Sequence, residues 1–563
     1  MIGFEENMEA WPVPRSLTQP SIWRRIMNSN WLNRIMEYTK ISSMHGLRYI
    51  GDRNLHILER FFWIASFLTA VATSAYFITN LFEKYNEMPV IMSLSPRPVM
   101  FNEVPFPAIT VCNMNNMRKS EAEKIFYAAE HGLYNEAFMD NKLVYDFCDR
   151  DPPKNLKNKS LGNSATWDYI QKFMINISQP CHEMFMHCEW HSEKQECMDF
   201  FNPSLTDEGI CCVFNRLKRE HIFNNPRDLS DLNLTFPGET YDWSPEKGFP
   251  KNLSPDTLPR RAKGPGSQLG LSIVVNAELE EYYCSTDNSQ GFKVMINNPL
   301  ETPKVSSFAL SVEPGKETKI VLTPKVITAT EQLRRIDISK RECYFENEKQ
   351  LFFYRTYSQR SCHLECEANF TIELCGCVLY YMPKNATTRI CGKMDKRCYN
   401  FAQKILEQSA KELTANAATK RLKTCNCLPA CHEISYSYML TTSRITDSLK
   451  IDPVMLGRFN TTYFKQNMAI IHFYYIERQF TSTIRGVLFG FTEFLSNTGG
   501  LLGLFFGFSF LSAVEIVYFL MLRVFCEQHK RKRPENDVEK NVTTQLSIAD
   551  PKFFIKPPLP FIK

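Results

Sequence analysis

The sequence has too few apolar residues for a transporter with many spans and too little net charge for a nucleic-acid-binding protein. Its 563 residues are 23% charged, with a mean hydropathy of −0.29, which leaves room for a few membrane spans at most. Lys and Arg (66) barely outnumber Asp and Glu (61), and no long basic stretch breaks the interior, so we expect no nucleic-acid partner. A nucleophile elbow, a phosphate loop and a convincing catalytic triad are also missing, so we expect neither enzymatic activity nor a cofactor.

Two long uncharged runs are present. Phe61 to Phe82 is long enough, at about 1.5 Å per residue, to cross about 30 Å of hydrocarbon. The second run is Phe494 to Val514, and it continues through Glu515 to Leu522. A buried globular helix could imitate either run, but their length favours two membrane-spanning helices. Because Met1 to Glu9 is acidic and no apolar core precedes Phe61, we expect an uncleaved anchor rather than a signal peptide.

Basic residues lie on the outer flanks of both runs. They are Arg24, Arg25, Arg34, Lys40, Arg48, Arg53 and Arg60 before the first, and Arg523 with Lys530, Arg531, Lys532 and Arg533 after the second. This distribution predicts that both termini are cytoplasmic and that residues 83–485 lie outside the cell.

Cysteine usage agrees with this topology. Eighteen of the nineteen cysteines fall in the external region, and only Cys526 lies on the reducing side, so nine disulfides are possible. The close spacing of cysteines between Cys362 and Cys431 would suggest zinc in a cytosolic chain, but outside the cell disulfides are favoured and we expect no structural metal. His182 and His187 are five residues apart and cannot chelate one zinc from one helix face. The same region holds seven candidate N-glycosylation sites, at Asn158, Asn176, Asn233, Asn252, Asn369, Asn385 and Asn460.

Apolar clustering between turn signals predicts a β-rich scaffold in the external region. The expected strands are Ala108 to Cys112, Gly270 to Asn276, Gly291 to Asn297 and Ala469 to Glu477. Helical periodicity in Lys119 to Gly132 and in Tyr399 to Leu413 predicts helical lobes beside the sheet. Residues 237–268, rich in Pro, Gly and charge, predict an irregular connection.

The second apolar run contains Gly499, Gly500, Gly503 and Gly507, and each glycine weakens a helix by about 1 kcal/mol relative to Ala. One explanation is close helix packing through the Gly503 and Gly507 pair. The other is that the helix opens near Gly507, where freed carbonyl groups would face ions in a water-filled path. Glu515 would then concentrate cations, or it would lie at the membrane interface, where its charge costs little.

Four motifs, in this order, carry a resemblance to a known family. They are Ser43-Met44-His45-Gly46, Phe106-Pro107-Ala108-Ile109-Thr110-Val111-Cys112-Asn113, Cys425-Asn426-Cys427-Leu428-Pro429-Ala430-Cys431, and Gly507-Phe508-Ser509. From Ser43 to Glu515 the chain resembles the degenerin/epithelial sodium channel/acid-sensing ion channel family, and within it the insect pickpocket branch.

The resemblance implies a trimeric membrane protein with two transmembrane helices and a large, disulfide-rich, β-centred α+β ectodomain of palm, β-ball, finger, thumb and knuckle. The implied division is listed here: 1–60, cytoplasmic; 61–82, first transmembrane helix; 83–485, extracellular, with a finger near 118–215 and a cysteine-rich thumb near 341–431; 486–523, pre-pore segment and second transmembrane helix; 524–563, cytoplasmic tail. The expected partners are membrane lipid and related subunits, in a homo- or heterotrimer at the plasma membrane.

The resemblance also implies a disulfide pattern. The pairs are Cys112–Cys211, Cys188–Cys197, Cys343–Cys431, Cys362–Cys427, Cys366–Cys425, Cys375–Cys398 and Cys377–Cys391. Cys148, Cys181, Cys212 and Cys284 are left without assigned partners.

The implied function is a sodium-selective, amiloride-sensitive, non-voltage-gated cation channel, opened by an extracellular mechanical or chemical stimulus and used in sensing. Gly507, Phe508 and Ser509 would form the selectivity filter, and Gly503 would contact the blocker. Ser496 would need a small side chain for pore closure, and the further pore or gating residues would be Asn497, Gly499, Gly500, Glu515, His45 and Gly46. Sodium is the permeant ion rather than a cofactor.

One departure from acid-sensing members concerns the stimulus. Glu280 and Glu281 match the finger carboxylates of a proton-sensing pocket, but the thumb side, counted from Cys398, presents Asn400 and Lys404. Lys404 would lower the pKa of those carboxyl groups, which opposes proton sensing near neutral pH. We therefore expect that external acid is not the main agonist at this pocket.

Three alternatives share some of these features. A scavenger-receptor-like glycoprotein also has two spans and a disulfide-bonded exterior, but it does not need a glycine-rich second span with Glu515. A nucleotide-gated trimeric channel has a shorter loop with basic residues for phosphate. The chain could also be a modulatory subunit that does not conduct.

Overall fold

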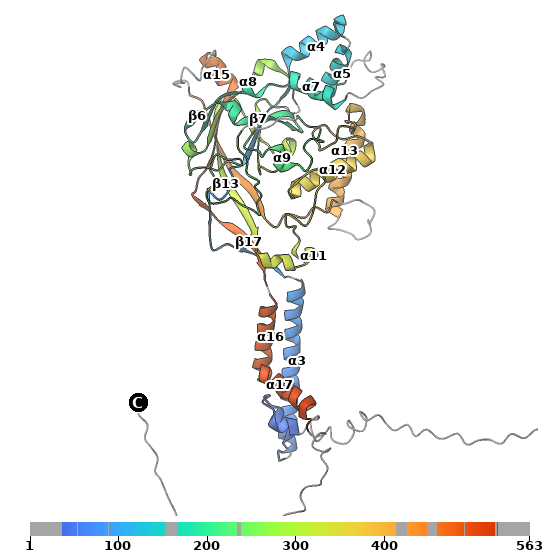
Figure 1. Ribbon diagram of the computed structural model, residues 1–563, viewed down its shortest axis with the longest axis vertical. Helices are drawn as coiled ribbons and strands as arrows, with labels where there is room; N and C mark the ends of the chain where they lie inside the picture. Colours follow the sequence, from blue (N-terminus) through green and yellow to red (C-terminus); the bar gives the residue numbers. More distant parts are fainter. Residues whose placement is uncertain are drawn as a thin grey trace, which may run out of the picture. The chain divides into compact units, whose positions relative to one another are not determined.

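The computed structural model describes residues 37–523 and Cys526, apart from residues 53, 88, 135, 152–165, 233–237, 286, 413–424, 447–458 and 489 (Figure 1). Contacts divide the chain into two compact units. The first comprises residues 1–86 and 489–563, and the second comprises residues 87–488. The first therefore contains both apolar runs, and the second contains the cysteine-rich region.

The first unit is built on the helix α3 (Ile57–Glu87), whose side chains are largely exposed apart from that of Ser74. Among the described residues, α3 is the helix that is by itself long and apolar enough to cross a membrane. It extends beyond the predicted run at both ends because the flanking charged residues, such as Glu59 and Lys84, are compatible with helix.

The second apolar run is interrupted. It forms α16 (Phe491–Phe506) and α17 (Phe510–Val517), which are bent by 74° at the break and reach the length of one span only together. A π-helical turn, Tyr518–Leu522, follows α17. The predicted opening of this helix near Gly507 is therefore present.

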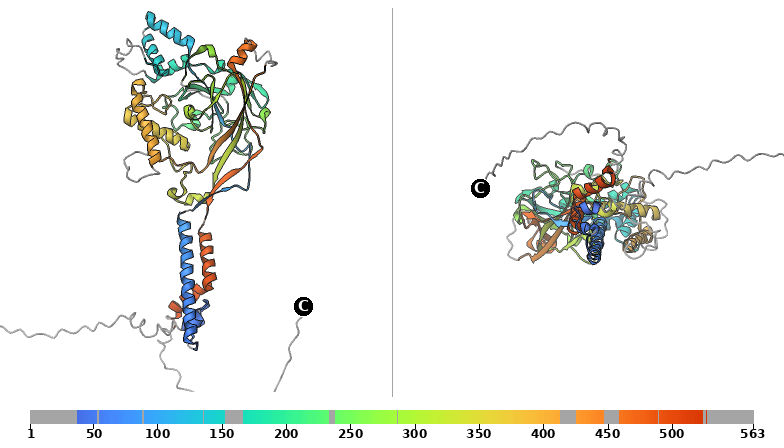
Figure 2. Two further views of the ribbon diagram at one scale, coloured as in Figure 1. Left: turned by 180° about the vertical axis from the view of Figure 1, so that it is seen from behind. Right: turned by 90° about the horizontal axis from the view of Figure 1, so that it is seen from below.

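Aromatic side chains join α16 to α3, and the two helices lie side by side (Figures 1 and 2). The ring centroids of Phe77 and Phe505 are 6.3 Å apart, and those of Phe67 and Phe506 are 5.6 Å apart. Phe494 contacts both Phe82 and Tyr85, with centroids 6.3 and 5.2 Å apart. One face of α16 is thus committed to α3.

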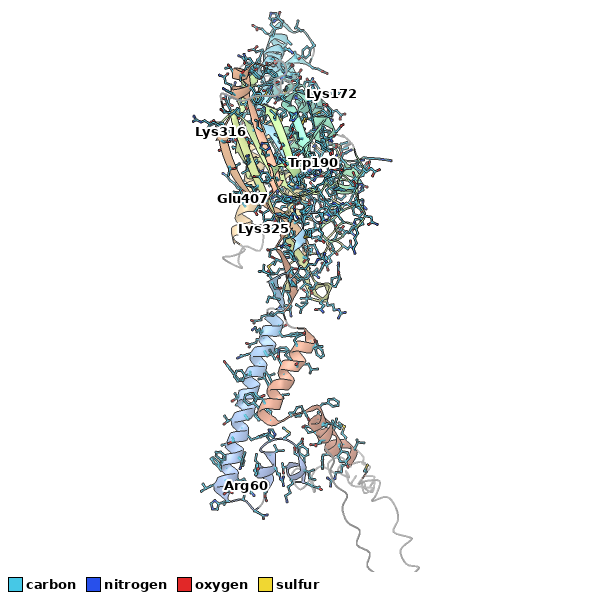
Figure 3. All side chains as sticks on the ribbon, turned by 90° about the vertical axis from the view of Figure 1, so that its left-hand side faces the viewer. Arg60, Lys172, Trp190, Lys316, Lys325 and Glu407 are labelled. Atoms are coloured by element: carbon cyan, nitrogen blue, oxygen red, sulfur yellow. A yellow bond between two sulfur atoms is a disulfide. The ribbon has the colours of Figure 1, made fainter. Side chains whose placement is uncertain are left out.

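The largest sheet of the second unit has the strand order β1-β17-β13-β15-β9-β5-β6, with β14 also paired to β13. Its strands are β1 (Val90–Leu94), β5 (Phe185–Trp190), β6 (Glu193–Gln195), β9 (Leu271–Asn276), β13 (Lys316–Ala329), β14 (Glu433–Arg444), β15 (Met468–Tyr475) and β17 (Ser482–Val487). The long strand β13 pairs with β14 on one edge, and in parallel with β15 and then β17 on the other. Lys316, the first residue of β13, and Lys325, four residues before its end, are labelled in Figure 3.

A second sheet has the order β12-β11-β3-β8-β7, made of β3 (Ala108–Asn113), β7 (Phe201–Thr206), β8 (Gly209–Phe214), β11 (Phe292–Asn297) and β12 (Leu310–Val312). Every residue of β3 is buried, as expected for an apolar central strand. Phe106 lies just before β3. Its ring centroid is 5.1 Å from that of Trp190 and 5.3 Å from that of Tyr475, and both of these residues belong to the large sheet. This aromatic cluster fixes the two sheets to each other.

Helices lie on one side of the large sheet, as both ribbon views show (Figures 1 and 2). They are α4 (Lys119–His131), α5 (Ala137–Phe147) and α7 (Trp167–Ile177) in the predicted finger, and α12 (Gln359–Cys375) and α13 (Lys396–Glu412) in the predicted thumb. The four predicted strands and both predicted helices are confirmed within a few residues.

The described region contains nine disulfides, and Cys526 is a free, exposed thiol. Seven of them are the pairs that the resemblance implied. The four unassigned cysteines form Cys148–Cys284 and Cys181–Cys212. Successive residues of a strand point to opposite faces, so the adjacent Cys211 and Cys212 of β8 reach different partners.

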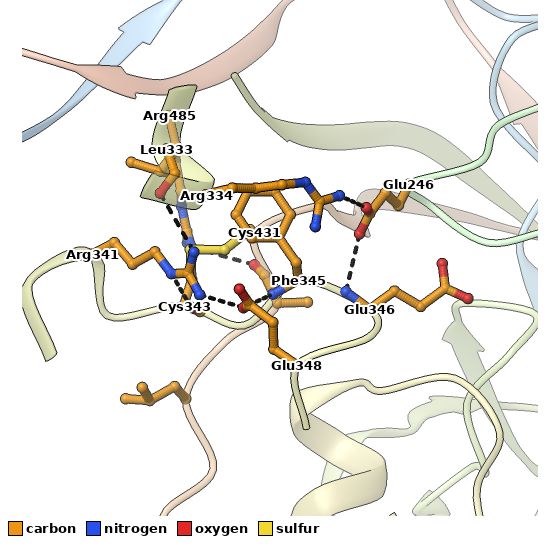
Figure 4. The surroundings of a disulfide bond; sticks show 12 residues. Glu246, Leu333, Arg334, Arg341, Cys343, Phe345, Glu346, Glu348, Cys431 and Arg485 are labelled. Atoms are coloured by element: carbon orange, nitrogen blue, oxygen red, sulfur yellow. Dashed lines mark hydrogen bonds and ion pairs between the residues drawn. A yellow bond between two sulfur atoms is a disulfide. The ribbon is translucent and has the colours of Figure 1, made fainter. Parts of the chain in front are cut away.

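The Cys343–Cys431 disulfide lies within a cluster of paired charges (Figure 4). The guanidinium groups of Arg334 and Arg341 lie over the Phe345 ring, 4.0 and 4.9 Å from its centroid. Arg334 pairs with Glu246, and Arg341 pairs with Glu348. Since Arg341 is 4% exposed, its partner carboxylate is needed to offset the loss of hydration.

The pairing of Cys181 and Cys212 is a testable result of this fold. Proteolysis of the unreduced, alkylated protein should yield one linked species that contains the peptides of Cys112, Cys181 and the adjacent Cys211 and Cys212, and fragmentation between Cys211 and Cys212 in the mass spectrometer should assign Cys112 to the first and Cys181 to the second. Removing the second bond by a double Ser substitution should lower the free energy of unfolding by about 2–5 kcal/mol. Peptides that link Cys181 to Cys211 would contradict the assignment, and Cys526, which should be alkylated without reduction, provides the internal control.

Candidate functional site

The break in the second apolar run has a local cause in the sequence Gly507-Phe508-Ser509. Gly507 ends α16 with φ = 63°, a left-handed conformation that costs other residues roughly 1–2 kcal/mol, and its N–H donates to the Gly503 carbonyl at 2.8 Å. Ser509 then begins α17, because its hydroxyl accepts from the Ser512 N–H at 3.3 Å while the Ser512 hydroxyl accepts from the Ser509 N–H at 3.2 Å. This reciprocal capping box encodes a helix stop followed at once by a helix start.

The break frees backbone oxygen atoms. Within the part of the chain that the structure describes, the carbonyl groups of Gly507 and Phe508 accept no hydrogen bond. Backbone polar groups without partners are tolerated at membrane depth only where they meet water, an ion or further protein. The segment therefore presents two carbonyl groups that are available for a ligand.

The predicted cytoplasmic motif lies directly against the break. The His45 N–H donates to the Phe506 carbonyl at 2.8 Å, and a side-chain carbon on Gly507 would lie 2.6–2.8 Å from the imidazole ring. Gly507 is thus required twice, by its backbone conformation and by the closeness of His45. Gly46 follows with φ = 80° and starts the short helix α2 (Leu47–Gly51), so it turns the chain immediately after this contact.

Polar side chains attach the same motif to α17. The hydroxyl groups of Ser43 and Ser512 are 2.9 Å apart, and Ser512 is fully buried. The Ser43 hydroxyl also donates to Glu515 at 3.1 Å, and the Ser43 N–H lies 3.4 Å from the same carboxylate oxygen. Glu515 therefore has a partner in this chain. Sequence reasoning missed Ser512, although its position three residues after Ser509 is a capping-box signal.

Small residues recur on the face of α16 that points away from α3. Ser496, Gly500, Gly503 and Gly507 are spaced by four, three and four residues, which places them on one side of the helix, roughly opposite Phe494 and Phe505. Ser496, Asn497, Gly499 and Gly500 are exposed, and a side-chain carbon on Gly499 or Gly500 would meet nothing within 4 Å. This face is open in the single chain.

The prediction that Lys404 lowers the pKa of Glu281 is wrong. The pKa of Glu281 is lowered even though burial opposes its ionisation, because Ser120 donates hydrogen bonds to it and Arg118 and Lys119 lie nearby. Lys404, on α13, is exposed and is not among the groups that shift this pKa.

Other thumb lysines do contact finger carboxylates. Lys396 pairs with Asp149 at 2.5 Å, and Lys393 pairs with Asp151 at 3.5 Å. The thumb therefore presents positive charge to the finger, as the departure from acid-sensing members implied, but it does so through residues nearer the start of α13. These two finger–thumb contacts join opposite charges, and neither of them needs a shared proton.

Five of the seven predicted glycosylation sites are exposed asparagines: Asn176, Asn252, Asn369, Asn385 and Asn460. Asn158 and Asn233 lie outside the described residues. Asn460 also caps α15 (Thr461–Asn467), because its side-chain oxygen accepts from the Tyr463 N–H at 2.7 Å.

Comparison with known proteins gives a consistent picture. The family model described as amiloride-sensitive sodium channel matches residues 38–519. Pickpocket protein 28 of Drosophila melanogaster is 36% identical over 515 residues, which covers 88% of this chain and 81% of that protein. Sodium channel protein Nach of the same species is 24% identical over 527 residues, covering 92% and 91% of the two chains. Acid-sensing ion channel 1 of Gallus gallus is 22% identical over 542 residues, covering 92% and 90%.

The family match begins just before the His45 motif and ends just after Glu515, so it includes both halves of the broken-helix site and the whole of the second unit. The chain therefore belongs to the amiloride-sensitive sodium channel family, and it is a cation channel subunit related to the pickpocket, Nach and acid-sensing proteins.

Proposed function

We propose that three copies of this chain, or of this chain and related subunits, surround a sodium-selective, amiloride-sensitive pore that an extracellular mechanical or chemical stimulus opens. The observation that carries this proposal is the interruption of the second apolar segment at Gly507-Phe508-Ser509, with two carbonyl groups left without partners. A ring of such carbonyl groups, one set per subunit, can replace part of the hydration shell of a cation. The break thus supplies the selectivity filter.

The open face of α16 supports the assembly. Its small residues would let three α16 helices approach closely at Ser496 and narrow the pore there. Asn497, Gly499 and Gly500 would line the same narrow part of the pore. Gly503 lies one turn before the filter, where a bulky organic cation arriving from outside would stop, so it is the proposed blocker contact. The gate and the filter would then share one helix.

The motif at His45 and Gly46 would set how readily the pore opens. Its backbone and ring contacts with Phe506 and Gly507 hold the α16 terminus in place, and Ser43 holds α17 through Ser512 and Glu515. Glu515 would thus serve in positioning as well as in attracting cations. A movement of the segment around residues 43–46 would reach the filter directly.

The proposed topology places both termini in the cytoplasm of a cell whose plasma membrane holds the channel. Eighteen cysteines are paired in the second unit, and disulfides persist in oxidising surroundings, so this unit would face outward. The free thiol of Cys526 would lie on the reducing side.

Substitution of Ser496 tests the proposed gate. Ser496→Val adds volume where three helices would meet, so it should hold the pore open and raise the resting, amiloride-blockable sodium current at least severalfold in oocytes. Thr498→Val is the matched control, because Thr498 lies on the side of α16 near Phe494 and should leave the resting current unchanged. An unchanged resting current in Ser496→Val, with normal surface expression, would rule out this gate.

Substitution of Gly507 tests the filter. Gly507→Ala should abolish current or sodium selectivity without loss of surface expression, since the new methyl group would meet the His45 ring at 2.6–2.8 Å and strain the backbone by about 1–2 kcal/mol. Adding His45→Ala should restore part of the current by removing the clash. Gly503→Ala, where nothing lies nearer than 3.9 Å, should still conduct and should change amiloride block. Normal reversal potentials in Gly507→Ala would contradict the assignment.

Lowering external pH tests the stimulus. Because the pKa of Glu281 is lowered, this carboxylate stays charged between pH 7.4 and pH 6 and takes up no proton there. Acid at pH 6 should therefore evoke no large sodium current through this pocket, and Glu280→Gln should have little effect on any current. The comparison variant is Glu301→Gln, because burial raises the pKa of Glu301 to about 7 and makes it protonate in this range. A large current at pH 6 that Glu280→Gln abolishes would overturn this prediction.

A further inference from the structure

A small cavity in the second unit is lined by more basic than acidic side chains. It has a volume of about 60 Å³ and lies where β7, the segment after β8, α9 (Arg219–Ile222) and the thumb segment before and after α12 meet. Three cationic residues line it, Arg216, Arg219 and Lys384, together with one carboxylate, Asp231.

The single carboxylate is already engaged. Asp231 accepts from Arg219 through both of its oxygen atoms, at 2.7 and 2.8 Å, and Arg219 also donates to the Pro226 carbonyl at 2.6 Å. This bidentate pair satisfies Arg219. It leaves Arg216 and Lys384 without a carboxylate partner within 4 Å among the described residues. The neighbouring segment 233–237 has the sequence Asn-Leu-Thr-Phe-Pro and adds no acidic side chain.

Arg216 is the least satisfied of these groups. It is 9% exposed, and its Nε atom is buried without any hydrogen-bond partner. Its remaining contacts are with hydroxyl groups, at 2.7 Å from Ser204 and at 3.4 Å from Thr302. Hydroxyl groups are neutral, so they accept hydrogen bonds from the guanidinium but do not neutralise it.

Lys384 is buried to a similar degree, at 1% exposed. Its ammonium group donates to the Tyr380 carbonyl and lies 3.9 Å from the centre of the Trp167 ring. Burial lowers the pKa of Lys384 to about 7, with Asp231 as a weak opposing influence. Lys384 is thus partly neutral near physiological pH, whereas Arg216 keeps its charge. The cavity therefore requires about one negative charge.

We propose that this cavity binds one small monovalent inorganic anion, of which chloride is the abundant example outside cells, with Arg216 as its principal contact. On this measure of volume a site needs about 10–15 Å³ to hold one water molecule, so the cavity has room for a small ion, and Leu205, Phe223 and Met382 add apolar surface to its lining. A water molecule could satisfy the Nε donor but could not offset the buried charge.

Arg261 and Arg485 also have a buried Nε atom without a partner, but they differ from Arg216 in their other contacts. Arg261 is 7% exposed, and its two terminal nitrogens donate to the Asn102 and Leu253 carbonyls at 2.9 and 2.6 Å. Arg485 is 8% exposed, donates to the Ala430 carbonyl at 3.3 Å and lines none of the described cavities. Carbonyl dipoles are stronger acceptors than hydroxyl groups, and Arg261 lines none of the described cavities. Arg341 has a carboxylate partner. Arg216 thus differs from these arginines in lining a cavity with only hydroxyl groups as partners.

Anion binding would have a structural consequence. The cavity joins Ser204 of β7 and Arg216, which follows β8, to Tyr381 and Lys384, which belong to the cysteine-rich thumb segment. An anion there would attach the thumb to the sheet, so its loss would loosen that attachment.

The test is thermal unfolding of the purified, detergent-solubilised full-length protein in sodium chloride and in sodium gluconate at equal ionic strength. We expect Tm to be at least about 2 °C higher in chloride, with a saturable dependence on chloride concentration. Arg216→Met should abolish this difference. Arg261→Met is the matched control, and it should lower Tm equally in both salts while the difference between them persists.

Bromide provides a second measurement that does not depend on a variant being stable. A structure of the unmodified protein in sodium bromide should show anomalous density beside the Arg216 Nε atom. Equal Tm values in the two salts together with no bromide density would mean that the cavity holds water only, and would overturn the proposal. A salt difference that persists in Arg216→Met would place the anion elsewhere and would overturn it too. Neither measurement uses ionic current, so the result is independent of the proposed channel function.

Discussion

A left-handed glycine in the middle of an apolar segment is the constraint on which the first unit depends. Gly507 stops α16 before it is long enough to cross a membrane, and Ser509 restarts the chain in a new direction. The interruption exposes backbone oxygens, creates the surface on which His45 rests, and sets the position of Glu515 next to Ser43. A continuous helix would remove all three features at once, whatever side chains it carried.

The second unit solves a different problem, which is to keep a large structure with several lobes rigid. Two sheets share an aromatic core around Phe106, and nine disulfides crosslink the described residues, five of them within the thumb segment 341–431. Charged residues are then used locally, either in compensated clusters such as that of Arg341 with Glu348, or across the finger and thumb through Lys396 and Asp149. The cavity at Arg216 is an exception, because this buried arginine has hydroxyl groups rather than a carboxylate as its partners.

Much of the fold could be predicted because it rests on local patterns. Apolar clustering located β3, β9, β11 and β15, helical periodicity located α4 and α13, and hydropathy located both apolar segments. The helix break was predictable because glycine density acts over a few positions, whereas the capping role of Ser512 was missed. By contrast, Ser43 and Glu515 are 472 positions apart, and no local pattern reports such a contact. The partners of Cys148 and Cys284, and the real charges around Glu281, depend on tertiary packing in the same way.

The two chain connections between the units leave from a single pair of neighbouring strands. β1 begins three residues after α3 ends, β17 ends four residues before α16 begins, and the two strands are antiparallel partners with Val90 opposite Val487. Both connections therefore leave through one hydrogen-bonded pair of strands. A displacement of this pair would reach α3 and α16 together rather than one of them alone.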